Sequence, residues 1–198
     1  MDSLQNIIIA FGYIGVFTAI FAESGFLLGF FLPGDSLLFT VGLLASTGVF
    51  NIWVLIVGCI LAAILGDSFG YYIGKRIGPS LFTRDDSYIF KKKYLLQTQE
   101  FYEKYGKKTI VLARFVPIVR TFAPIIAGVG NMKYSTFITY NVIGGITWTT
   151  GFLLMGFLLG KTVPGIEQYM SLIIAGIIIL SFMPIAWEFF KKSRQKKV

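Results

Sequence analysis

Two arginines lie inside one of the most apolar stretches of the chain. Arg114 and Arg120 belong to residues 109–131, which read TIVLARFVPIVRTFAPIIAGVGN. A guanidinium in hydrocarbon costs about 2.5 kcal/mol or more, so such arginines usually pair with another group or bind a ligand. Arginine stays protonated and its planar fork binds phosphate oxygens bidentately. The chemistry that these two residues favour is therefore the binding of an anionic group inside a membrane.

Two prolines interrupt the same stretch. Pro117 and Pro124 each remove a backbone donor, which breaks or kinks a helix. Broken helices at membrane depth are tolerated where the backbone is buried in protein or lines a cavity. Residues 109–131 are therefore predicted to form a re-entrant helical hairpin that holds Arg114 and Arg120 within the membrane.

Acidic residues stand near a second predicted break. Residues 24–48 are apolar but are cut by Pro33, Gly34 and Asp35, which predicts another re-entrant hairpin with Glu23 at its mouth and Asp35 near its tip. A buried carboxylate tends to take up a proton, whereas a neighbouring arginine holds it charged. Glu23 and Asp35 are therefore candidate partners of the arginines and candidate sites of proton coupling.

Asp67 and Asn141 are secondary candidates. Asp67 lies near the end of an apolar segment, where it could contact Lys75 or Arg76 or cap a broken helix, and Asn141 is expected to face protein and not lipid. The alternative for both is helix packing. For all of these charged residues the alternative is a set of buried ion pairs that only fix the hairpins.

Several kinds of chemistry are excluded by what the sequence lacks. It has no histidine, and its one cysteine, Cys59, lies in an apolar run. This excludes a phosphatase with a histidine nucleophile, and neither a disulfide nor a thiolate metal site is available. The acidic residues at membrane depth are few and dispersed, so no metal, no other cofactor and no headgroup-modifying enzyme is expected.

The composition is that of a polytopic, all-α membrane protein. The 198 residues are 55% hydrophobic and 14% charged, with a mean hydropathy of +0.72. Soluble domains are about one-quarter charged. The net charge is +8, and the basic residues responsible for it lie between and after apolar segments. They are therefore interpreted as signals of topology and as contacts with anionic lipid, and not as a nucleic-acid surface. Four full transmembrane helices are predicted, at residues 4–22, 51–73, 134–160 and 170–190.

Small residues and basic residues organise these helices. Gly66, Gly70, Gly74 and Gly78 recur at every fourth position, and Gly156 and Gly160 form a second pair, which predicts close helix packing. Residues 75–108 are predicted to form a cytoplasmic amphipathic loop, and residues 191–198 a basic cytoplasmic tail. The first helix has no basic segment before it and is read as a mature helix and not a cleaved signal peptide.

The positive charges also set the orientation. Loop 75–108 and tail 191–198 both carry the excess of lysine and arginine that marks the cytoplasmic side. Both regions lie on one side only if residues 109–131 re-enter the membrane without crossing it. The chain then forms one membrane domain with two halves of opposite orientation, residues 1–74 and 109–190, the inverted-repeat plan of many transporters.

Four segments together resemble one family. They read ESGFLLGFFLPGD, LGDSFGYYIGKRIG, ARFVPIVRTFAPIIAGVGNM and NVIGGITW, and in this order they are similar to the DedA family, also called the VTT or SNARE-associated Golgi family. The similarity covers roughly residues 12–160. Ala113 stands where that family often has another residue before the arginine.

The resemblance implies a bacterial cytoplasmic-membrane protein with two facing re-entrant hairpins that moves lipid between leaflets. It implies undecaprenyl phosphate, the lipid carrier of envelope synthesis, as the substrate and proton-motive force as the energy source. It also implies that Glu23, Asp35, Arg114 and Arg120 are the essential charged residues. The alternatives are a translocase or scramblase for phosphatidylethanolamine or other phospholipids, a cation/proton antiporter, and a scaffold for envelope machinery. The sequence leaves open whether the chain forms a homo-oligomer.

Overall fold

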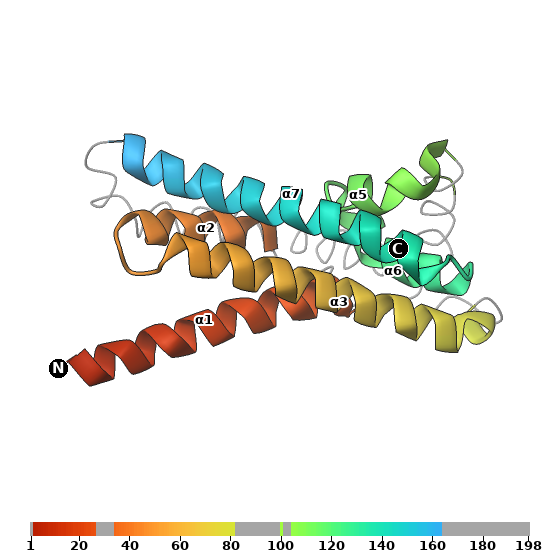
Figure 1. Cartoon of the computed structure of the whole chain (residues 1–198), viewed down its shortest axis with the longest axis horizontal. Coiled ribbons are helices and arrows are strands. Elements are labelled where there is room, and N and C mark those ends of the chain that lie inside the picture. Colours follow the sequence, from red (N-terminus) through yellow and green to blue (C-terminus); the bar gives the residue numbers. More distant parts are fainter. Residues whose placement is uncertain (1, 27–33, 82–99, 101–103, 164–198) are drawn as a thin grey trace, which may run out of the picture. The chain divides into compact units, whose positions relative to one another are not determined.

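All of the regular structure that is described is helical. The computed structural model describes residues 2–26, 34–81, 100 and 104–163 (Figure 1). In chain order the helices are α1 (Asp2–Gly25), α2 (Gly34–Ser46), α3 (Ile52–Leu81), the 3-10 helix η2 (Gly106–Lys108), α5 (Thr109–Ala113), α6 (Pro117–Val129) and α7 (Tyr134–Thr162). Within these residues the predicted all-α class is confirmed.

The chain divides into two compact units that are interleaved in the sequence. The first contains Met1–Leu32 and Trp53–Gly151, and the second contains Pro33–Ile52 and Phe152–Val198. The first unit therefore holds α1, most of α3, α5, α6 and most of α7. The division into halves 1–74 and 109–190 stays a prediction.

Glycines bring the helices of the first unit into backbone contact. A methyl group at Gly66 of α3 would lie 2.7 Å from the carbonyl oxygen of Phe21 in α1. One at Gly74 would lie 2.0 Å from the carbonyl oxygen of Ile125 in α6, and Gly70 faces the ring of Pro124. No side chain fits at such distances, so α3 packs directly against both α1 and α6. The predicted packing role of this glycine stripe is confirmed for its three members whose surroundings are described.

Aromatic residues join α3 to the beginning of α7. The ring of Tyr71 stacks on Phe137 with centroids 4.7 Å apart, and its hydroxyl group donates a hydrogen bond to the carbonyl of Met132. Tyr134 lies against Tyr71 at 5.5 Å. This cluster fixes the register between α3 and α7, on which the polar contacts described below depend.

The second unit packs α2 against the end of α7. A methyl group at Gly42 would lie 2.2 Å from the carbonyl oxygen of Leu153, and one at Gly156 would lie 2.1 Å from that of Phe39. Gly160 faces the hydroxyl group of Ser46. The predicted close packing of Gly156 and Gly160 is confirmed, and its partner is α2.

Two of the described helices are long and apolar enough to cross a membrane, namely Ile52–Arg76 and Tyr134–Thr162. The described apolar parts of the other helices are shorter: Ala10–Gly25, Gly34–Ser46 and Val119–Val129. The exposed face of α3 carries a large apolar residue at every fourth position, at Trp53, Val57, Leu61 and Leu65. Such a face is suited to lipid and would be a liability in water.

The helix boundaries correct the prediction in two places. Helix α3 continues to Leu81, beyond the predicted end at residue 73 and into the predicted loop 75–108. The apolar segment ends at residue 73, but the exposed residues Lys75 and Arg76 that follow are good helix formers, so the helix continues. The remaining described part of that loop is Glu100 and the residues from Lys104 onward, which include η2. The predicted helix 170–190 and tail 191–198 lie outside the described residues.

The second correction concerns Pro124. It was expected to break the helix within the hairpin, yet α6 continues through Pro124 without interruption from Pro117 to Val129. A proline inside a membrane helix removes one backbone hydrogen bond, and packing against a neighbouring helix can compensate for this loss. Pro124 is buried beside Gly70 of α3, which supplies such packing. Pro124 therefore serves the contact between α3 and α6.

Candidate functional site

Arg114 lies in the connection between two helices. α5 ends at Ala113, and the backbone N–H groups of Arg114, Phe115 and Val116 bond to carbonyls three residues back, at 3.3, 3.1 and 2.9 Å. Val116 is extended, as the residue before a proline usually is, and α6 then begins at Pro117. The helix interruption predicted at Pro117 is therefore present, and Arg114 is placed within it.

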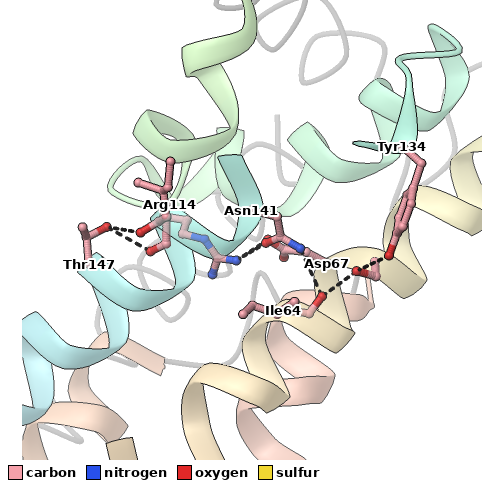
Figure 2. A network of polar contacts seen from close by, with 9 residues as sticks. Ile64, Asp67, Arg114, Tyr134, Asn141 and Thr147 are labelled. Carbon is pink, nitrogen blue, oxygen red and sulfur yellow. Dashed lines mark hydrogen bonds and ion pairs between the residues drawn. The ribbon is translucent and has the colours of Figure 1, made fainter. Parts of the chain in front are cut away.

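The guanidinium of Arg114 reaches between α3 and α7. The Nη2 atom donates hydrogen bonds to Asp67 Oδ2 on α3 and to Asn141 Oδ1 on α7, both at 2.5 Å (Figure 2). The side chain of Arg114 is only 2% exposed. This cation is thus held inside the protein by one carboxylate and one neutral amide.

The orientation of Asn141 is fixed from its other end. Its Nδ2 atom donates a hydrogen bond of 3.1 Å to the carbonyl of Ile64 on α3, so its amide oxygen must face Arg114. The same carbonyl accepts a hydrogen bond of 2.8 Å from Ser68, whose hydroxyl group lies 3.4 Å from that of Tyr134. Figure 2 shows these contacts as one network between the two long helices.

A single nitrogen of Arg114, Nη2, makes the contacts with both Asp67 and Asn141. Its Nε and Nη1 atoms are buried and have no hydrogen-bond acceptor among the described residues. Buried polar groups in proteins are nearly always hydrogen-bonded, and an unsatisfied donor on a charged group costs several kcal/mol. An anionic group that accepted a hydrogen bond from either of these two atoms would therefore be strongly stabilised.

Arg120 forms a second buried ion pair. It lies near the beginning of α6, and its Nη2 atom contacts Glu23 Oε1 near the end of α1. The side chain of Glu23 is 2% exposed and that of Arg120 is 10% exposed. This pair joins two helices that are far apart in the sequence.

The ring of Trp148 lies beside both guanidiniums. The Cζ atoms of Arg114 and Arg120 are 5.8 and 5.2 Å from its centroid, within the range of a cation–π interaction. Trp148 is itself buried. We call Glu23, Asp67, Arg114, Arg120, Asn141 and Trp148 the two-arginine site. It contains two cations and two carboxylates, in surroundings where charges interact more strongly than in water.

Two glycines on α7 make room for this arrangement. A methyl group at Gly144 would lie 2.9 Å from Arg114 Nε, and one at Gly145 would lie 3.1 Å from a side-chain carbon of Ile64. Any larger residue at position 144 would push the guanidinium away from α7. The absence of side chains at these positions is therefore part of how the site is built.

The structure brings together five of the six charged or amide residues that the sequence predicted. Arg114, Arg120, Glu23, Asp67 and Asn141 lie in the first unit and are connected as described. The expected contact of Asp67 with Lys75 or Arg76 is replaced by the one with Arg114, because Asp67 is on the buried face of α3 while both basic residues are exposed. Asn141 faces protein, as predicted.

The sixth residue, Asp35, lies in the second unit, in the first turn of α2. Gly34 begins that helix and Pro33 lies outside the described residues. A role for Asp35 beside the arginines stays a prediction.

Trp148 and Gly144 were not singled out from the sequence. Asn141, Gly144 and Trp148 are three and four residues apart, which places them on one face of a helix. That spacing in the segment NVIGGITW was the signal available. Among the described residues, no three histidine, cysteine or carboxylate side chains come together as a metal site requires.

Comparisons with known proteins point to one family. Residues 32–158 match the VTT domain. Protein DedA of Escherichia coli is 46% identical over 184 residues, which cover 92% of this chain and 84% of that protein. An uncharacterized membrane protein of Mycobacterium tuberculosis is 47% identical, with 86% and 75% covered, and the inner membrane protein YqjA of Escherichia coli is 30% identical, with 85% and 76% covered. No solved structure matches the chain.

Proposed function

The chain belongs to the VTT-domain family of membrane proteins, and on that premise we propose that it carries a phosphate-bearing lipid from one leaflet to the other. Undecaprenyl phosphate is the first candidate for this lipid, since it is the substrate that the family resemblance implies. The proposed location is the bacterial cytoplasmic membrane, and the proposed activity is transport and not enzymatic catalysis.

One observation carries this proposal. Arg114 is buried near the same indole ring as a second arginine, with its Nε and Nη1 atoms unused by any described acceptor. A phosphate group in transit loses its water and needs replacement donors, and the N–H groups of a guanidinium bind phosphate oxygens well. The headgroup would bind at the two-arginine site while the tail stays in lipid.

The two carboxylates have a proposed part in energy coupling. Glu23 and Asp67 each pair with one arginine, so an incoming phosphate would compete with them for the same cations. A carboxylate that loses its arginine inside the protein favours its protonated form. We therefore propose proton coupling at Glu23, with Asp35 as a further acid of the pathway.

The proposed topology keeps four spans and two hairpins. Helix α6 has 13 residues, or about 20 Å at 1.5 Å per residue, which is too short for a hydrocarbon core of about 30 Å. This supports re-entry of residues 109–131, and hairpin 24–48 would open to the opposite side, with the C-terminus in the cytoplasm.

Single cysteines introduced at Lys108 and Lys133 in a Cys59→Ala background test the second hairpin. Labelling of both from the same side of intact spheroplasts is expected, and labelling from opposite sides would show a full crossing.

The function is tested with purified protein in liposomes. Fluorescent undecaprenyl phosphate is placed in both leaflets, and the fraction that an impermeant quencher reaches is followed with time. We expect exchange with the wild-type protein and none with Arg114→Ala. The matched control is Thr139→Val on α7, whose exposed hydroxyl group bonds to the Ser135 carbonyl of its own helix. Wild-type exchange in a correctly folded Arg114→Ala protein would contradict the proposal.

Other outcomes of the same assay identify the alternatives. Equal exchange of phosphatidylethanolamine and of undecaprenyl phosphate would favour a general phospholipid translocase. A proton flux driven by Na⁺ or K⁺, with no lipid movement, would favour a cation/proton antiporter. Two arginines at the centre of the site disfavour a cation as substrate, because like charges repel strongly in a buried environment.

A further inference from the structure

Asp67 and Asn141 hold the same nitrogen of Arg114 but differ in charge. Given the proposed function, we propose that Asp67 is an internal anion that competes with the lipid phosphate for Arg114. Asn141 is then the positioning residue that keeps Arg114 in place when Asp67 is displaced. This assigns separate tasks to two residues that the family resemblance did not place at the site.

The geometry of the ion pair supports the first part. An arginine and a carboxylate often pair through two parallel hydrogen bonds. Here the contact uses only Arg114 Nη2 and Asp67 Oδ2, which leaves the Nε and Nη1 atoms for another acceptor. Both guanidinium edges that can bind a phosphate bidentately include Nη2, so a phosphate that binds such an edge together with Nε or Nη1 competes with Asp67 for Nη2.

The geometry of Asn141 supports the second part. Its amide is attached at both ends, to Arg114 through Oδ1 and to the Ile64 carbonyl through Nδ2. Because it is neutral, it neither repels an incoming anion nor depends on the ionisation of a neighbour. It can therefore hold Arg114 with or without a phosphate bound, whereas Asp67 competes with the phosphate for the guanidinium.

The two roles predict affinity changes of opposite sign. Asp67→Asn keeps the shape of the side chain and an acceptor for Arg114, but it removes a negative charge from beside the bound phosphate. Affinity for the lipid should rise about tenfold and maximal exchange should slow, because release becomes harder. Asn141→Asp adds a second negative charge on the same nitrogen, so affinity should fall about tenfold.

A structural role alone predicts a different pattern. If these residues only held the helices together, both substitutions would weaken binding or leave it unchanged, and neither would tighten it. The readout is therefore the pair of dissociation constant and maximal exchange rate. The dissociation constant is measured by titrating a short-chain prenyl phosphate into the detergent-solubilised full chain, with the corresponding prenyl alcohol as competitor. Thr139→Val again serves as the matched control.

The arms of the experiment separate this inference from the proposed function. If the wild-type protein does not bind the prenyl phosphate, the proposed function fails. If the wild-type protein binds it and Arg114→Ala does not, the function stands, and the inference then requires tighter binding by Asp67→Asn and weaker binding by Asn141→Asp. Unchanged or weaker binding by Asp67→Asn overturns the inference. Should Asp67→Asn not fold, unchanged or tighter binding by Asn141→Asp overturns it.

Discussion

Arg114 and Arg120 lie against the same indole ring but are held in different ways. Arg114 is in a turn between two helices, is 2% exposed, and is fixed by side chains from α3 and α7. Arg120 is in a regular helix, is 10% exposed, and pairs with Glu23 of α1. Arg114 is therefore the more buried of the two and has two buried donors without a described acceptor, while Arg120 connects α6 to α1. We expect Arg114 to contribute more to binding of the anion.

The largest effect is expected at Arg114. Arg114→Lys keeps the charge but cannot hold Asp67 and Asn141 while also offering two donors to a phosphate. The rate of lipid exchange in liposomes should fall by about 100-fold, a change of roughly 2.7 kcal/mol in the barrier. Exchange above one-tenth of the wild-type rate would show that charge alone suffices at this position.

Arg120 should be more tolerant of the same substitution. Arg120→Lys keeps a cation that can still reach Glu23, so the exchange rate should fall by about tenfold or less. The comparison between the two lysine variants, made at equal protein density in the liposomes, sharpens the difference described above. Equal losses in both variants would mean that the two arginines act as equivalent ligands.

The room that α7 leaves for Arg114 can be closed with one methyl group. Gly144→Ala would place a carbon 2.9 Å from Arg114 Nε, so the guanidinium must shift. The exchange rate should fall by about fivefold, or roughly 1 kcal/mol. Gly151→Ala on the same helix is the matched control, because a methyl group there has no described atom within 4 Å. Similar losses in both variants would point to a general effect on α7.

Trp148 should give the smallest effect. Trp148→Phe keeps an aromatic face beside both cations but a weaker one, and a cation–π contact is worth about 0.5–2 kcal/mol. We expect a loss of about twofold in exchange rate and a larger loss for Trp148→Leu. If the leucine variant matched the phenylalanine variant, Trp148 would act by filling space and not through its ring electrons.

Much of the site could be predicted because its residues are of types that are rare in apolar membrane segments. Arginines and carboxylates in apolar segments, and a proline after a short helix, are visible in one sequence, so Arg114, Arg120, Glu23 and Pro117 were identified. Which acid meets which arginine could not be predicted. Asp67 is 47 positions from Arg114, and Glu23 is 97 positions from Arg120. Such pairings depend on how the helices pack.

The errors have similar physical causes. Pro124, like Pro117, lies in an apolar segment and was expected to break a helix. Instead α6 continues through Pro124, whose ring packs beside Gly70 of α3. α3 was predicted to end where its hydrophobicity ends, although its backbone continues as helix to Leu81. Trp148 was overlooked because a tryptophan in an apolar helix breaks no rule. Only the fold places its ring beside two cations.

The most direct test measures the distance between Arg114 and a lipid phosphorus atom. Protein with ¹⁵N-labelled arginine is placed in phosphorus-free lipid, loaded with undecaprenyl phosphate, and studied by ¹⁵N–³¹P dipolar recoupling in solid-state NMR. The Arg114 signal is identified by its loss in Arg114→Lys. The account predicts dephasing of the Arg114 Nε and Nη signals by the headgroup. Full lipid exchange without any such dephasing would contradict it.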